Sequence, residues 1–139
     1  MLIISHRGNL QGSNAELENN PLHIKKVIDK FDVEIDVWFV DKKWYLGHDK
    51  PQYQVSFDFF NDRMWLHCKN LEACSEMNNT SLNWFWHEND KVTLTSKKYI
   101  WAHPDVYVRD GITVEFGFND KLPEFILGVC TDYPEKYNE

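Results

Sequence analysis

Apolar residues along this chain fall into short runs that are separated by polar segments. Each run has the length of one β-strand and is too short for a typical helix. The expected strands cover residues 2–6, 33–39, 43–47, 64–69, 84–88, 92–95, 99–102, 113–116 and 126–131. Two connections, residues 89–91 and 96–98, are too short for a crossover helix, because parallel strands need about a dozen connecting residues. We therefore expect several connections to be loops.

Two segments have the spacing of amphipathic helices. The first covers residues 21–30 and begins with Pro21, which suits the opening turn of a helix. The second covers residues 71–78. The apolar stripe of the first helix consists of Leu22, Ile24, Val27 and Ile28. His23 lies on the same helix, where we expect a solvated side chain.

Polar residues stand at the ends of three apolar runs, where barrel enzymes hold their chemistry. These endings are Ser5-His6-Arg7-Gly8, Glu34-Ile35-Asp36 and Gly47-His48-Asp49. Because side chains alternate across a strand, Glu34 and Asp36 share one face, and Val33, Ile35 and Val37 share the other. Adjacent carboxylates repel each other, so the pair suits a hard cation such as Mg²⁺ or Ca²⁺. A structural ion pair with Arg7 and Lys69 is the alternative.

The motifs taken together resemble those of the glycerophosphodiester phosphodiesterases. This family belongs to the barrel phosphodiesterases, which include bacterial phosphatidylinositol phospholipases. The matching segments are His6-Arg7-Gly8, Glu18-Asn19, Glu34-Ile35-Asp36, His48-Asp49 and Thr131-Asp132-Tyr133-Pro134. They span most of the chain and are densest near its two ends.

The resemblance implies an α/β fold of the TIM-barrel type. A full barrel needs about 200–250 residues, whereas this chain has 139. We therefore expect one phosphodiesterase-like domain over residues 1–139. Its predicted architecture is a reduced TIM-type (β/α) barrel with several covering helices shortened or missing.

The activity implied by the resemblance is metal-dependent hydrolysis of a small glycerophosphodiester-like phosphoric diester. In similar enzymes a neighbouring hydroxyl attacks phosphorus and a cyclic phosphate forms. His6 and His48 would be the general acid and base. Arg7 would grip the phosphate, and Lys69 would add positive charge where negative charge develops. Glu34 and Asp36 would hold the cation that assists the attack.

The sequence departs from the family pattern at the strand covering residues 64–69. The family carries an acid two residues before its lysine, and here His67 precedes Lys69. His67 is either a third metal ligand, which favours Mn²⁺ or Zn²⁺ over Mg²⁺, or a hydrogen-bond donor to the phosphate. Both uses remain open at this point.

Other readings of the same residues lead to different functions. The main alternative is a non-catalytic barrel domain that binds a phosphorylated ligand or partner without turnover. Catalysis without a metal is disfavoured because Glu34 and Asp36 are both acidic. His87 and His103 are candidates for lining the pocket, and Thr131-Asp132 is expected to anchor the barrel mouth by hydrogen bonds.

Composition limits the partners and the compartment. A net charge of −7 argues against nucleic acid, because binding a phosphate backbone requires clustered lysine and arginine. The apolar run at the N-terminus is too short for a signal peptide or a membrane span, so no stable membrane insertion is expected. Three cysteines make an odd count that argues against a disulfide framework. Cytoplasmic residence is the resulting expectation.

Aromatic residues make up 15% of the chain, including six tryptophans. In a barrel with few covering helices, Trp84, Trp86 and Trp101 have two possible uses. They could cover exposed strand faces in a homodimer, or they could fill an undersized core, since aromatic side chains dominate core burial.

Overall fold

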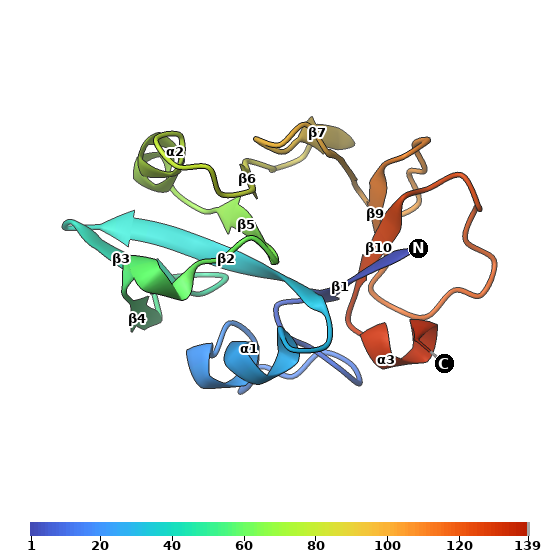
Figure 1. Cartoon of the computed structure of the whole chain (residues 1–139), viewed down its shortest axis with the longest axis horizontal. Coiled ribbons are helices and arrows are strands. Elements are labelled where there is room, and N and C mark those ends of the chain that lie inside the picture. The colour runs from blue at the N-terminus through green and yellow to red at the C-terminus, as the bar shows by residue number, and fades with distance from the viewer. Residues whose placement is uncertain (139) are drawn as a thin grey trace.

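The computed structural model describes residues 1–138, in which ten strands form one curled sheet (Figure 1). The strands are β1 (Leu2–His6), β2 (Asp32–Val40), β3 (Lys43–Leu46), β4 (Tyr53–Val55), β5 (Met64–Cys68), β6 (Trp84–Phe85), β7 (Val92–Leu94), β8 (Ile100–Ala102), β9 (Ile112–Val114) and β10 (Gly128–Thr131). The helices are α1 (Pro21–Val27), α2 (Leu71–Met77), α3 (Pro134–Tyr137) and a short 3₁₀ helix, η1 (Phe57–Phe59).

The strand order places distant parts of the chain side by side. The main path runs β4-β3-β2-β1-β10-β9-β8-β7, and β5 pairs with β2 and with β6. β1 lies between β2 and β10 and is parallel to both. The first part of β2 pairs with β1, its later part pairs with β3 in the antiparallel direction, and β5 runs parallel to it. The ends of β1, β2, β5 and β10 are thereby brought together.

The predicted α/β fold, a reduced TIM-type (β/α) barrel, is wrong. Within residues 1–138 the fold is mostly β, a curled mixed sheet that forms a half-barrel with three short α-helices. Helices do not alternate with strands, because the connections from β6 to β9 are short and the 115–127 connection is irregular. Antiparallel pairing of β2 with β3, β3 with β4 and β7 with β8 takes the place of several crossovers.

The larger hydrophobic core lies on the outer side of β2 and β5. As alternation predicts, Val33, Ile35 and Val37 are fully buried there, together with Leu66 of β5. Helix α1 contributes Ile24 and Val27 to this core, and α2 contributes Ala73 and Met77. The two helices therefore cover the β2–β5 part of the sheet.

Helix α1 is shorter than its sequence pattern indicates. Asn20 caps its start by accepting a hydrogen bond from the Leu22 N–H, and Pro21 occupies the first turn. The helix ends at Val27 rather than at residue 30. Leu22, which was expected in the apolar stripe, is 74% exposed.

A smaller core fills the inner side of the curl with aromatic side chains. Trp65, Phe85 and Trp101 are buried in it, with Phe85 and Trp101 stacked at a centroid separation of 4.6 Å. These two rings come from β6 and β8, which do not pair with each other. Trp101 therefore fills the core, which was one of its two predicted uses. The predicted homodimer stays a prediction.

Several apolar side chains are uncovered on the connection between β9 and β10. Phe116, Phe118, Phe125 and Leu127 are all exposed.

Within residues 1–138, the helices are too short or too polar for any of them to cross a membrane.

Candidate functional site

Strand β2 carries two buried carboxylates on the inner side of the sheet. Its apolar residues pack outward, so the pleat turns Glu34 and Asp36 inward. The Glu34 side chain is 3% exposed and the Asp36 side chain 1%. Burial of two like charges is costly unless cations lie beside them. The neighbouring strands supply such groups.

His67 is the first of these neighbours, and the sheet register places it there. It lies opposite Asp36 in the parallel pairing of β5 with β2. Its Nδ1 is 3.3 Å from Asp36 Oδ1 and 3.7 Å from Glu34 Oε2. Burial lowers the pKa of His67, but its contacts with Asp36 and Glu34 outweigh burial and raise the pKa to about 9. In the same cluster, burial raises the pKa of Asp36, while His67 and Arg7 hold it well below its usual range.

The other ring nitrogen of His67 fixes the orientation of the side chain. Nε2 lies 3.1 Å from the main-chain carbonyl of His87. A carbonyl only accepts hydrogen bonds, so Nε2 carries a hydrogen and donates it. In the neutral ring, Nδ1 therefore holds the free lone pair and directs it toward the two carboxylates.

Two oxygens of this cluster have no hydrogen-bond partner. Both Glu34 Oε1 and Asp36 Oδ1 are buried, and neither accepts a hydrogen bond within the described residues. One ligand atom from each of Glu34, Asp36 and His67 lies within 4.8 Å of the other two. Two carboxylates and one imidazole with unsatisfied buried oxygens fit a divalent cation.

The first loop holds Asp36 through Asn19. Asn19 Nδ2 donates to Asp36 Oδ2 at 2.9 Å, and the Asp36 main-chain N–H donates to Asn19 Oδ1 at 3.0 Å. Asn19 adopts a left-handed backbone conformation with φ of 58°, which asparagine tolerates better than most residues. The loop motif Glu18-Asn19 thus contacts the site, and Asp36 Oδ1 is left facing His67 Nδ1.

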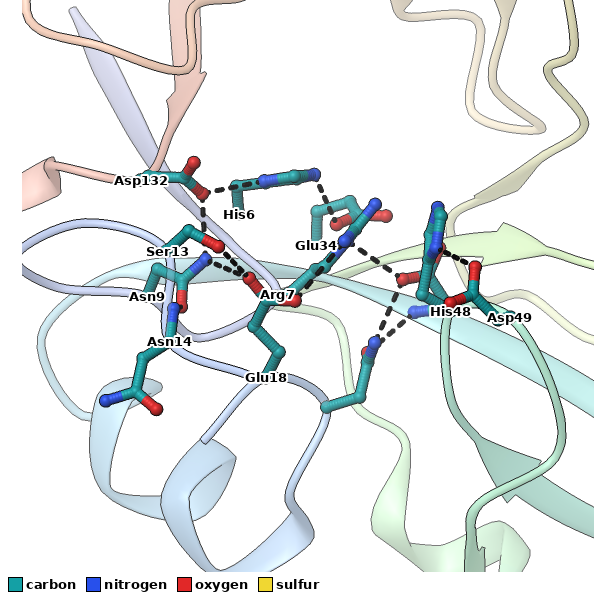
Figure 2. Close-up of polar contacts among 12 residues, drawn as sticks. His6, Arg7, Asn9, Ser13, Asn14, Glu18, Glu34, His48, Asp49 and Asp132 are labelled. Carbon is teal, nitrogen blue, oxygen red and sulfur yellow. Dashed lines mark hydrogen bonds and ion pairs between the residues drawn. The ribbon is translucent and has the colours of Figure 1, made fainter. Parts of the chain in front are cut away.

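Arg7 lies between the cluster and the first loop (Figure 2). One terminal nitrogen, Nη1, donates to Glu18 Oε2 at 3.3 Å, and Nε lies 3.2 Å from Asp36 Oδ2. The Nε contact is an ion pair without hydrogen-bond geometry, so this buried N–H remains unpaired. Arg7 is therefore positioned by two carboxylates, and its side chain stays 19% exposed.

His6 is held between two carboxylates, as Figure 2 shows. Its Nδ1 donates to Asp132 Oδ1 at 2.8 Å, and its Nε2 lies 3.9 Å from Glu34 Oε1. Asn9 also donates to Asp132 Oδ1, which fixes the carboxylate. Burial lowers the pKa of His6, but the hydrogen bond to Asp132 and the charge of Glu34 outweigh burial and raise it. Asp132 was expected to anchor a barrel mouth by hydrogen bonds, whereas in this half-barrel it accepts hydrogen bonds from His6 and Asn9.

His48 stands apart from His6. It follows β3 in a loop where Gly47 approaches the Lys50 carbonyl too closely for a side chain. Its Nδ1 donates to Asp49 Oδ1 at 2.7 Å, and the ring is 42% exposed. In Figure 2 it lies on the side of Arg7 away from Asp132.

Two adjacent hollows border these side chains. One, of about 260 Å³, is lined by His48 and by the Glu18-Asn19 loop. The other, of about 170 Å³, is lined by His6, Glu34 and His67. Arg7 lines both. The two predicted acid–base histidines therefore face different hollows that share one arginine.

His87 and His103 line the smaller hollow, as the sequence suggested. His87 Nδ1 donates to Asp90 Oδ2 at 2.9 Å, and the His87 and His103 ring centroids are 6.2 Å apart. The apolar side of the same hollow includes Trp101 and Phe116. The hollow thus combines imidazole donors with an aromatic wall.

Lys69 is not brought into the cluster. β5 ends at Cys68, and the Lys69 main-chain N–H donates to the Val37 carbonyl. Within residues 1–138, its ammonium group makes no hydrogen bond or ion pair, and it lines neither hollow. His23, which was expected to be solvated, instead has Nε2 2.8 Å from the Gly8 carbonyl, to which it donates.

A larger hollow, of about 860 Å³, lies elsewhere. It is formed by the 118–127 loop with Met1, Arg109 and Tyr137. None of the clustered carboxylates or histidines lines it. The candidate functional side chains line the smaller hollows instead.

No protein-family model, curated protein or solved structure matches this chain. The family resemblance accordingly rests on the sequence motifs alone.

Proposed function

We propose that this protein is a divalent-metal-dependent phosphoric diester hydrolase of the glycerophosphodiester phosphodiesterase type. One observation carries the proposal. The sheet register sets His6 opposite Glu34 and Asp36 opposite His67, so a proton carrier adjoins a candidate cation site at one edge of the sheet. Arg7 follows His6 directly and lines both hollows beside that site.

Arg7 is the anchor for the phosphate of a small diester. Its guanidinium side chain is 19% exposed and lines both hollows. A guanidinium group recognises phosphate oxygens through directed hydrogen bonds. A phosphate held there would have its two ester arms directed toward the two hollows.

Glu34, Asp36 and His67 are the residues that would hold the cation. When bound, a divalent cation lowers the proton affinity of the attacking hydroxyl and neutralises a non-bridging oxygen of the phosphate. The burial of Glu34 and Asp36 is consistent with this use, because one oxygen of each carboxylate makes no hydrogen bond within the described residues.

His6 supplies proton transfer in this proposal. Asp132 holds the ring through Nδ1, which leaves Nε2 for proton transfer, and His6 lines the smaller hollow. In the reaction a P–O bond forms to a neighbouring substrate hydroxyl and the P–O bond to the leaving alcohol breaks. One imidazole takes the hydroxyl proton and a second returns a proton to the alcohol, and His48 is the second candidate. Water then opens the cyclic phosphate by the reverse proton transfers.

The second candidate function is binding of a phosphorylated ligand or partner without turnover. The ion pairs of Arg7 with Glu18 and Asp36 favour it, as does the raised pKa of His67. These groups can balance the buried charges without a metal. Lys69 supports neither function in its observed position.

A hydrolysis assay with matched variants distinguishes the two functions. The wild-type protein, His6→Gln and His23→Gln are incubated with a panel of glycerophosphodiesters and each of Mg²⁺, Ca²⁺, Mn²⁺ and Zn²⁺, or with a chelator. The proposal predicts cation-dependent turnover by wild type and His23→Gln, and loss of at least about 100-fold in His6→Gln. Binding of a phosphodiester without turnover by wild type under every condition would establish the binding function instead.

A further inference from the structure

The cation site contains one feature that a site for Mg²⁺ or Ca²⁺ does not need. Its third side chain is an imidazole, His67, where the two carboxylates would ordinarily be joined by another oxygen ligand. We propose that His67 makes this centre selective for a borderline transition-metal cation, of the series Mn²⁺ to Zn²⁺, over Mg²⁺ and Ca²⁺. The inference rests on the cation site of the proposed function, and it does not require that the substrate be a diester.

The orientation of the His67 ring supports a ligand role. The hydrogen bond from Nε2 to the His87 carbonyl leaves Nδ1 facing Asp36 Oδ1 at 3.3 Å and Glu34 Oε2 at 3.7 Å. Metal-binding histidines usually donate their second ring N–H to a carbonyl or carboxylate in this way. The nitrogen that faces the carboxylates is thus the one that can bind a cation.

The ring is also held in place by packing. It stacks on Phe85 with a centroid separation of 4.9 Å and an interplanar angle of 15°. The backbone of β5 is paired to β2 at the same residue, opposite Asp36. A hard cation that prefers oxygen would have to accept this nitrogen or bind through the two carboxylates alone.

The amide oxygen of Asn19, another oxygen beside Asp36, is already engaged. Asn19 Oδ1 accepts the main-chain N–H of Asp36, and Asn19 Nδ2 donates to Asp36 Oδ2. Three protein ligands of mixed nitrogen and oxygen type, with further positions open toward a hollow, are typical of catalytic transition-metal sites. For such ligands, affinity rises from Mn²⁺ toward the later metals of the series.

The test is direct metal binding, with no assay of catalysis. Chelator-treated protein is titrated by calorimetry with Mg²⁺, Ca²⁺, Mn²⁺, Co²⁺ and Zn²⁺, and Co²⁺ binding is followed by its visible absorption. Three variants are compared with wild type: His67→Gln, His67→Glu and the control His103→Gln. His103 lines the same hollow but lies outside the cation group. Circular dichroism verifies that each variant is folded.

The inference predicts that wild type and His103→Gln bind Co²⁺ and Zn²⁺ at least about 100-fold more tightly than Mg²⁺. His67→Gln should lose most of that affinity, and His67→Glu should gain Mg²⁺ or Ca²⁺ binding and alter the Co²⁺ spectrum. Equal or tighter Mg²⁺ binding by wild type would overturn the inference, as would Zn²⁺ affinity that is unchanged in folded His67→Gln. Absence of binding for every cation would overturn both the inference and the cation site of the proposed function. Tight Zn²⁺ binding through His67 without diester hydrolysis would leave the inference standing and overturn the proposed function alone.

Discussion

Asp36 and His67 face each other across the parallel strands β2 and β5, with His67 Nδ1 3.3 Å from Asp36 Oδ1. Arg7 contacts the other oxygen of the same carboxylate, Oδ2, through Nε at 3.2 Å. The buried Asp36 carboxylate of β2 thus contacts a residue of β5 and the residue that follows β1. Its removal should affect both the fold and the cation site.

We expect Asp36→Asn to destabilise the protein by about 3 kcal/mol in the presence of a chelator, because His67 and Arg7 lose a buried counter-charge. Urea denaturation measures the free energy of unfolding. The control Asp62→Asn removes an exposed carboxylate that pairs with Lys97 and should change stability by no more than about 0.5 kcal/mol. Equal effects of the two substitutions would contradict the central position of Asp36.

The raised pKa of His67 makes the stability of the metal-free protein depend on pH. The folded state holds the His67 proton with a pKa of about 9, against 6.5 for an ordinary histidine. Its contribution is therefore complete below pH 6.5 and is lost as the pH rises through about 9, amounting to about 3 kcal/mol. The difference in unfolding free energy between wild type and His67→Gln, measured in chelator at pH 6 and pH 10, should shrink by this amount. A difference that is the same at both pH values would show that His67 is not paired as described.

Cation binding at the same group should release a proton. Between pH 6.5 and about 9, His67 of the metal-free protein is protonated, and a cation that binds Nδ1 must displace that proton. Zn²⁺ titrations in buffers of different ionisation enthalpy should therefore report about one proton released per ion at pH 7.5. In His67→Glu this release should disappear. A wild-type value near zero would mean that the cation does not bind through His67.

Asp132 positions His6, and its replacement should reduce turnover without weakening substrate binding. Asp132→Asn removes the charged acceptor of the His6 Nδ1 hydrogen bond. We expect kcat to fall by about 100-fold with KM little changed, because the imidazole loses its orientation and its charge support. Glu135→Gln is the matched control, since Glu135 lies nearby and bonds only the exposed Gln11 side chain among the described residues. Equal kcat values for the two variants would remove Asp132 from the mechanism.

Local alternation predicted one part of this site correctly. The pattern of β2 alone places Glu34 and Asp36 opposite Val33, Ile35 and Val37. The packing of the three apolar residues in the larger core agrees with this prediction. The strand expected over residues 64–69 stops short of Lys69, because β5 ends at Cys68 and the chain then turns into the loop before α2. Periodicity applies only as far as the strand continues.

Contacts that depend on register and loop conformation could not be read from the pattern. The approach of His67 to Asp36 depends on how β5 aligns with β2, and Asp132 reaches His6 through the pairing of β10 with β1. The prediction of the fold class was wrong for a related reason. Short connections were recognised, but the sequence did not show that antiparallel hairpins and an aromatic inner core would replace the missing helices.

A phosphorus NMR time course tests the central claim most directly. Wild-type protein is incubated with a glycerophosphodiester and Mn²⁺ or Zn²⁺, and a parallel sample contains excess chelator. The account predicts that the diester signal decays, through a cyclic phosphate or directly to a monoester, only in the sample with free cation. A diester signal that persists in both samples, with the cation bound to the protein, would contradict the account.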